Sequence, residues 1–87
     1  MSRPIEVLHI VRRDADTYPL RLAQRGGPGH AVLLLSDGVR NPPLPGVRTY
    51  AAARCAAERK VAPAPALPLD DAAIIALLLA AHRVIGW

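Results

Sequence analysis

The sequence predicts a small three-layer α/β domain, with a mainly parallel sheet of about four strands and helices on both faces. The first observation behind this prediction is the segment 31–38 (AVLLLSDG), an unbroken apolar run that ends in a polar turn. Such a run is typical of a parallel strand whose two faces are both covered by helices. The second observation is that strand-like and helix-like segments alternate along the chain. Eighty-seven residues suit one domain, which we place over residues 1–87.

Short runs of apolar and β-branched residues predict four strands: Ile5–Val11, His30–Ser36, Val47–Ala51 and Val84–Trp87. Helix-forming residues predict three helices: Asp16–Arg25, Ala52–Lys60 and a last helix from Asp70 to His82 or Arg83. Asp16 or Thr17 is the expected cap of the first helix, and Pro19 fits its first turn. A single helix over Arg48–Lys60 is the alternative to a third strand followed by a second helix.

Glycine and proline divide these elements. The run Gly26–Gly29 (GGPG) ends the first helix. The segment Arg40–Gly46 (RNPPLPG) holds three prolines and can be neither a helix nor a central strand. In Val61–Leu69 apolar residues alternate with prolines, which predicts an extended edge segment or a loop.

The charge pattern does not indicate a nucleic-acid-binding protein. The net charge is +4, and all eleven cationic residues except Lys60 are arginines spread along the chain without a long basic run. The aromatic residues are Tyr18, Tyr50 and Trp87. Proteins that bind nucleic acids combine a basic patch with stacking aromatic residues or a recognisable motif. We therefore expect no direct contact with nucleic acid.

The cysteine and histidine content limits the possible chemistry. A single cysteine, Cys55, excludes an internal disulfide framework and a cysteine-based zinc cluster. The three histidines lack the spacing of metal ligands, so we expect neither a metal nor another cofactor. His9 lies in the middle of a predicted strand, where a core or interface histidine with one hydrogen-bonded nitrogen is expected. His30 and His82 flank elements and are expected to face solvent.

The apolar segments are too short to place the chain in a membrane. Glu6 and the following arginines interrupt the apolar run near the N-terminus, so it does not resemble a signal peptide. The apolar segment Ala72–Ala81 covers about half the length that a bilayer span requires. We expect a cytoplasmic protein.

The last helix predicts a contact with another subunit. Its leucines and isoleucines cover nearly every direction around the helix, and a helix of this kind is buried on more than one side. The core is also thin, because the chain has no phenylalanine and sixteen alanines. The residues expected at this interface are Ile74, Ile75, Leu78 and Trp87.

Two places could carry chemistry. The turn Ser36-Asp37-Gly38 follows a predicted buried strand, and ligands of open α/β sheets bind just beyond the carboxyl ends of strands. The alternative is a simple turn in which Gly38 supplies a backbone angle that other residues resist. Cys55 is the candidate catalytic nucleophile, and Arg54 and Arg59 would lower its pKa if they turned toward it. The alternative for Cys55 is a small buried core residue.

Three short strings, VLHIVRR, VLLLSDGV and HRVIGW, occur in this order along the chain. Together they resemble the DsrH/TusB family, the smaller-subunit branch of the DsrE/DsrF-like sulfur-relay proteins. The matching positions are Leu8-His9 in the first strand, Asp37-Gly38-Val39 after the second, and Trp87 at the end. The chain departs from the family pattern after Val39, where the proline-rich segment 41–46 replaces a helix.

The resemblance implies a DsrE-like fold and a subunit of a complex that passes persulfide sulfur. Such complexes serve the 2-thiolation of the tRNA wobble uridine or dissimilatory sulfur oxidation. The implied partners are paralogous DsrE/DsrF-like (TusD/TusC-like) subunits in a hetero-oligomer; a homo-oligomer is the alternative. We expect a non-catalytic subunit. The alternatives are a sulfurtransferase that acts through a persulfide on Cys55 and a stand-alone homo-oligomer that binds a small ligand.

Overall fold

The structure of the protein is a computed structural model that describes residues 4–87, so the first three residues of the predicted domain lie outside it. The strands are β1 (Val7–Val11), β2 (His30–Leu34), β3 (Arg48–Ala52), β4 (Leu67–Leu69) and β5 (Arg83–Gly86). The helices are α1 (Tyr18–Gly26), α2 (Ala53–Glu58) and α3 (Asp71–Ala80), and a 3-10 turn, η1 (Ser36–Arg40), follows β2.

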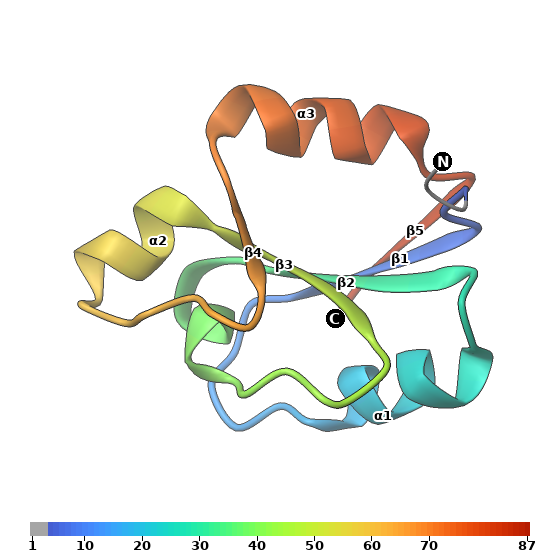
Figure 1. Cartoon of the computed structure of the whole chain (residues 1–87), viewed down its shortest axis with the longest axis horizontal. Coiled ribbons are helices and arrows are strands. Elements are labelled where there is room, and N and C mark those ends of the chain that lie inside the picture. Colours follow the sequence, from blue (N-terminus) through green and yellow to red (C-terminus); the bar gives the residue numbers. More distant parts are fainter. Residues whose placement is uncertain (1–3) are drawn as a thin grey trace.

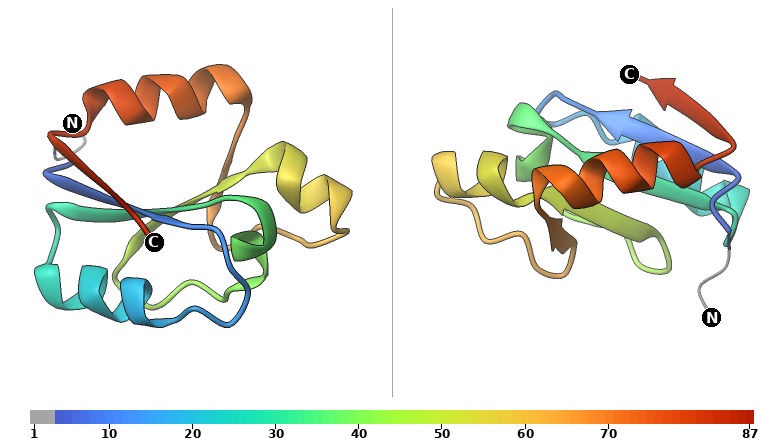
Figure 2. Two further views of the ribbon diagram at one scale, coloured as in Figure 1. Left: turned by 180° about the vertical axis from the view of Figure 1, so that it is seen from behind. Right: turned by 90° about the horizontal axis from the view of Figure 1, so that it is seen from above.

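The strands form one parallel sheet in the order β4-β3-β2-β1-β5. Helix α1 lies on one face of this sheet and α3 on the other (Figure 1). The view from above in Figure 2 shows α3 lying over the sheet, with β4 toward one side and β5 toward the other. The predicted three-layer α/β class is therefore confirmed, with five strands where about four were expected.

The additional strand is β4, which lies in the segment expected to be an edge strand or a loop. It pairs with β3 through Tyr50–Leu67 and Ala52–Leu69 and stands at the edge of the sheet. This position suits Pro68, because proline cannot donate a hydrogen bond to a second neighbour. The alternative of one helix over Arg48–Lys60 is wrong, because Arg48–Ala52 pairs with β2 instead.

The helix boundaries follow local sequence signals in two of the three helices. Thr17 stands at the N-cap of α1 without a side-chain hydrogen bond, and the proline expected in the first turn is present. Asp70 caps α3 by accepting a hydrogen bond from the Ala73 amide at 2.8 Å. Helix α3 ends at Ala80, before the predicted His82 or Arg83, because Arg83 already begins β5.

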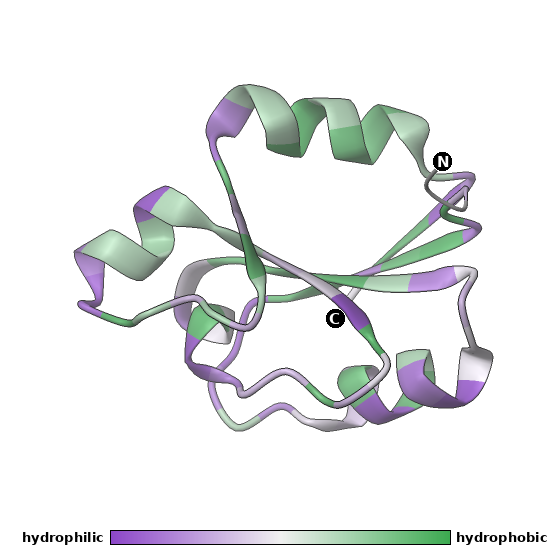
Figure 3. Ribbon diagram, viewed as in Figure 1, coloured by the Kyte–Doolittle hydropathy of each residue, from purple (hydrophilic) through white to green (hydrophobic). Residues whose placement is uncertain are grey.

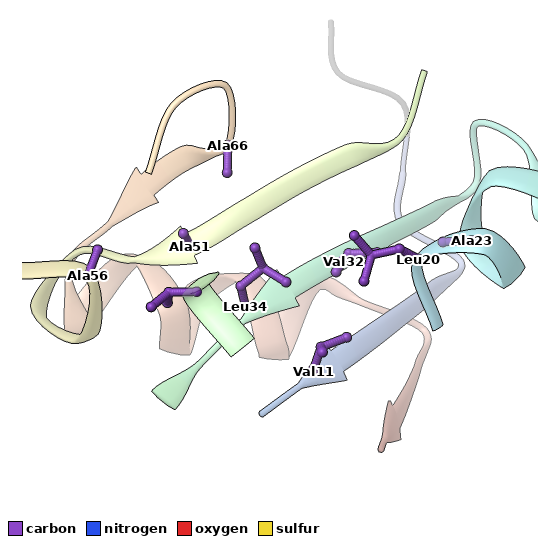
Figure 4. Close-up of a cluster of buried hydrophobic side chains, with 9 residues drawn as sticks. Val11, Leu20, Ala23, Val32, Leu34, Ala51, Ala56 and Ala66 are labelled. Carbon is purple, nitrogen blue, oxygen red and sulfur yellow. The ribbon is translucent and has the colours of Figure 1, made fainter. Parts of the chain in front are cut away.

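The core divides into two clusters because successive strand residues point to opposite faces of the sheet. The cluster on the α1 side, drawn in Figure 4, consists of Val11, Leu20, Ala23, Val32, Leu34, Val39, Ala51, Ala56 and Ala66. The cluster on the α3 side consists of Ile5, Leu8, Ala31 and Leu33, with Ile74, Leu77, Leu78 and Ala81 packed on it. Each face of the sheet is thus covered mainly by one helix, α1 on one face and α3 on the other.

The turn after β2 packs directly against the end of β1. A Cβ added to Gly38 would overlap the carbonyl oxygen of Val11, and the Leu35 amide donates to that same oxygen at 2.9 Å. The explanation offered for Gly38 from the sequence is therefore wrong. Glycine is required at position 38 because no side chain fits there. The residue of this turn with a positive φ, +53°, is Ser36.

Across residues 4–87, none of the helices is long and apolar enough to cross a membrane.

Candidate functional site

Arg59 joins the two places that were predicted to carry chemistry. Its Nε lies 2.7 Å from Asp37 Oδ1, and its Nη2 donates to Ser36 Oγ at 3.2 Å. Its Nη1 donates to the carbonyl oxygen of Cys55 at 3.3 Å. The turn after β2 and the helix after β3 therefore meet at the carboxyl end of the sheet, as expected for neighbouring parallel strands.

The Arg59–Asp37 ion pair lies at the surface of the molecule. The Asp37 side chain is 59% exposed and that of Arg59 is 23% exposed. The hydrogen bond from Arg59, and then the charge of Arg59, hold the pKa of Asp37 below its ordinary value. Asp37 therefore stays ionised and paired, and it serves first to fix Arg59 over the turn.

Cys55 is half-buried and packs against the core cluster on the α1 side. The hydrogen bond to Asp37 is the main cause of the raised pKa of Arg59, and interaction with Cys55 adds to it. Arg54 turns away and pairs with Asp71 of α3 at 2.6 Å. Of the two arginines expected near the thiol, Arg59 contacts the backbone of Cys55 and Arg54 pairs elsewhere, and the packing of Cys55 is that of a small core residue.

A second polar cluster crosses the sheet on the α1 side, and the sequence did not reveal it. His9 is 1% exposed, and its two ring nitrogens both have partners. His9 Nε2 lies 2.9 Å from His30 Nδ1, and Trp87 Nε1 donates to His9 Nδ1 at 3.1 Å. The expectation of one bonded nitrogen for His9 is therefore wrong, and His30 is half-buried against His9 instead of facing solvent fully. His82 is exposed, as expected.

The rings of this cluster are also in contact. His9 and His30 stack with centroids 5.2 Å apart, and His9 and Trp87 stack at 6.1 Å. The edge of Tyr18 meets Trp87 at 5.5 Å. A Cβ added to Gly26 would overlap the ring of His30. The register of β1 and β2 determines the His9–His30 contact. His30 is the first residue of β2 and pairs with Val7, which lies two residues before His9 and points to the same face of the sheet.

Burial lowers the pKa of His9, and the charge on His30 lowers it further. His9 is therefore neutral near pH 7 and can accept a hydrogen bond.

The four residues expected at an interface lie in different surroundings. Ile75 is 58% exposed, whereas Ile74 and Leu78 pack on the chain's own sheet. Trp87 packs on His9. Leu79, which is 82% exposed, extends the outward face of α3 that Ile75 begins. Figure 3 shows that α3 is apolar along its length after the acidic start.

No group of His, Cys, Asp and Glu side chains in the part of the chain that the structure describes is arranged to hold a metal ion. Comparisons of the chain with family models, with curated proteins and with solved structures find no match.

Proposed function

We propose that the protein is a non-catalytic subunit of a sulfur-relay complex, in which paralogous subunits carry the active cysteine. The observation that carries this proposal is that the first of the three strings that resemble the DsrH/TusB family contacts each of the other two. His9 of the first string bonds to Trp87 of the last. Gly38 of the middle string rests on Val11 of the first.

The outward face of α3 supports a role as a subunit. Between Ala72 and Ala81 the helix has no polar side chain, yet Ile75 and Leu79 face outward. Exposed apolar surface of this kind is typical of a site that another chain covers. The proposed partners are paralogous DsrE/DsrF-like (TusD/TusC-like) subunits in a hetero-oligomer. A homo-oligomer would cover the same face.

The proposed cellular role is the passage of persulfide sulfur in the cytoplasm. Two processes fit, the 2-thiolation of the tRNA wobble uridine and dissimilatory sulfur oxidation. The proposed subunit needs no cofactor and makes no direct contact with nucleic acid.

Affinity purification of the tagged chain from its native lysate, followed by mass spectrometry, tests the partnership. We expect two paralogous chains of the same fold class to co-purify in fixed stoichiometry. Leu79→Lys should remove them, because it places a charge in the apolar face, while Arg21→Lys on the far side of the sheet should retain them. Recovery of the chain alone, as a homo-oligomer, would favour the stand-alone ligand-binding alternative.

The packing of Cys55 supports a non-catalytic role. In the reconstituted complex, Cys55→Ser should leave the rate of sulfur transfer within about twofold of the wild type, because the substituted side chain is similar in size. Complete loss of transfer in this variant would contradict the proposal.

A sulfurtransferase that acts through Cys55 is the second candidate, and the position of Arg59 favours it. Arg59 donates to the carbonyl oxygen of Cys55 and links this backbone to the turn Ser36-Asp37 at the carboxyl end of the sheet. In this reaction the Cys55 thiolate attacks the terminal sulfur of a donor persulfide, a new S–S bond forms, and the donor leaves as a thiolate. Incubation with a cysteine desulfurase and cysteine would then add about 32 Da, one sulfur atom, to Cys55. The non-catalytic subunit gains no such mass.

A further inference from the structure

A chain of hydrogen bonds links three neighbouring strands on the α1 side of the sheet. It runs from Trp87, directly after β5, to His9 in the middle of β1 and then to His30 at the start of β2. His9 is almost fully buried, and Trp87 and His30 are half-buried. This series of hydrogen bonds therefore reaches from the core to the surface through His30.

The chemistry of the three rings fixes the position of each ring N–H proton in this series of hydrogen bonds. The indole nitrogen of Trp87 can only donate, so His9 Nδ1 must be unprotonated. A neutral His9 then carries its proton on Nε2 and donates to His30 Nδ1. His30 in turn carries its proton on Nε2. One arrangement of protons satisfies both hydrogen bonds.

We propose that Trp87, His9 and His30 form a proton-operated latch, which holds Trp87 against the sheet when both histidines are neutral and releases it when the pair takes up one proton. A proton added to His9 must occupy Nδ1, where it faces the indole N–H and removes that hydrogen bond. A proton added to His30 occupies Nδ1 and faces the N–H of His9. The His9–His30 bond then survives only if the His9 proton moves to Nδ1, which again displaces Trp87.

The two histidines of the pair differ in their surroundings. The burial of His9 and its proximity to His30 disfavour a charge on His9 itself. His30 lies at the half-exposed end, beside Gly26, whose missing side chain makes room for the ring. Loss of the Trp87 bond is thus the expected consequence of a proton that arrives from solvent.

Each element packed around the latch contributes a titratable or charged group. Tyr18 of α1 meets the indole edge-on, and Arg12, after β1, donates weakly to the Trp87 carbonyl at 3.5 Å. Glu6 precedes β1, and its carboxylate would meet a side chain placed at Gly29, next to His30. Arg83 opens β5 at the opposite end of that strand. Of these groups, His30 is the one whose charge acts on the pKa of His9.

Release of the latch would loosen the edge of the sheet without unfolding it. The Trp87 amide still donates to the Ile10 carbonyl at 3.0 Å, and β5 keeps its ladder with β1. The indole would leave its place between His9 and Tyr18 and expose this side of β1 to solvent. The inference is independent of the proposed function and can be tested on the isolated chain.

Trp87 is the sole tryptophan of the chain, so intrinsic fluorescence reports on the latch directly. In a titration from about pH 8 to about pH 5, where histidine is the side chain that changes charge, we expect one transition with a red shift of the emission. The protection of the indole proton against exchange, measured by NMR relative to its intrinsic exchange rate at each pH, should fall by about tenfold across it, as expected for the loss of one hydrogen bond. Far-UV circular dichroism should stay constant.

His30→Gln is the decisive variant, because the glutamine oxygen can accept the hydrogen bond from His9 but cannot take up a proton. It should move the transition to lower pH or abolish it. His82→Gln, at an exposed histidine outside the cluster, is the matched control and should titrate like the wild type. A flat wild-type titration, a His30→Gln titration identical to that of the wild type, or loss of circular dichroism together with the fluorescence change would overturn the proposal. The wild-type titration decides the question even if His30→Gln does not fold.

Discussion

Gly38 stands where the turn after β2 meets the end of β1, and a side chain does not fit there. We predict that Gly38→Ala lowers the free energy of unfolding by about 3 kcal/mol, because backbone atoms of Val11 must move to make room. Urea denaturation measures the loss. Gly86→Ala is the matched control, since nothing lies within 4 Å of its added Cβ, and it should stay within about 0.5 kcal/mol of the wild type. Equal losses in the two variants would contradict the steric explanation.

The burial of His9 makes the stability of the chain depend on pH. The unfolded chain titrates His9 near its ordinary pKa of 6.5, whereas burial and then the charge on His30 lower the folded pKa. The unfolded chain therefore binds this proton first as the pH falls. The His9 contribution to stability is complete above pH 6.5 and is lost progressively below it. Denaturation midpoints measured at several pH values should fall accordingly.

The variant His9→Phe isolates this effect, because phenylalanine fills a similar space and does not titrate. It should weaken the dependence on pH below 6.5, while His82→Gln should keep it. An unchanged dependence in His9→Phe would assign the effect to other groups.

At the scale of secondary-structure elements, the stability of α3 depends more on its N-cap than on its surface ion pair. Asp70 accepts a hydrogen bond from the Ala73 amide, whereas Asp71 pairs with Arg54 in solvent. Asp70→Ala should therefore cost about 1 kcal/mol of stability. Asp71→Ala should cost about 0.5 kcal/mol or less. Thermal melts followed by circular dichroism compare the two, and a larger loss for Asp71→Ala would reverse this assignment.

The two faces of α3 should respond differently to truncation. Leu78 packs on the sheet, whereas Leu79 is 82% exposed. In the isolated chain, Leu78→Ala should lower the free energy of unfolding by about 2 kcal/mol, and Leu79→Ala by about 0.5 kcal/mol or less. Urea denaturation at low protein concentration measures both. A large loss for Leu79→Ala would mean that the isolated chain already covers this face by self-association.

At the scale of the whole molecule, the sequence predicted the layers but not the contacts between strands. Apolar runs and helix-forming segments are local signals, so β1, β2, β3 and β5 were predicted near their observed positions. Strand β4 has three residues with a proline among them and gave a weaker signal.

The contacts of the site depend on register and order, which are not local. His9 meets His30 and Trp87 only because β1 lies between β2 and β5. Likewise, Arg59 reaches Asp37 only because the turn after β2 and the helix after β3 meet at one end of the sheet. The sequence predicted Cys55 and the turn Ser36-Asp37-Gly38 as two separate candidate sites. In the structure they are connected by Arg59, which the sequence analysis considered only as a neighbour of the thiol.

The edge of the sheet provides a test of the whole architecture. Strand β5 covers one side of β1, so deletion of residues 83–87 should leave the hydrogen-bonding groups of β1 open and cause aggregation. Size-exclusion chromatography with light scattering detects it. Trp87→Leu retains the backbone of β5 and should remain dispersed. A deletion variant that stays monomeric and folded would show that β5 is dispensable.

The strand order also determines when the molecule can be completed during its synthesis. Strand β1 is the first to be made, and β5, its neighbour on one side, is the last. Until residues 83–86 have been made and have left the ribosome, β1 pairs with β2 alone and one edge of the growing sheet stays bare. The sheet is therefore completed at β1 only after its other strands have been made, and we expect chaperones that bind extended apolar segments to act on the chain before that step.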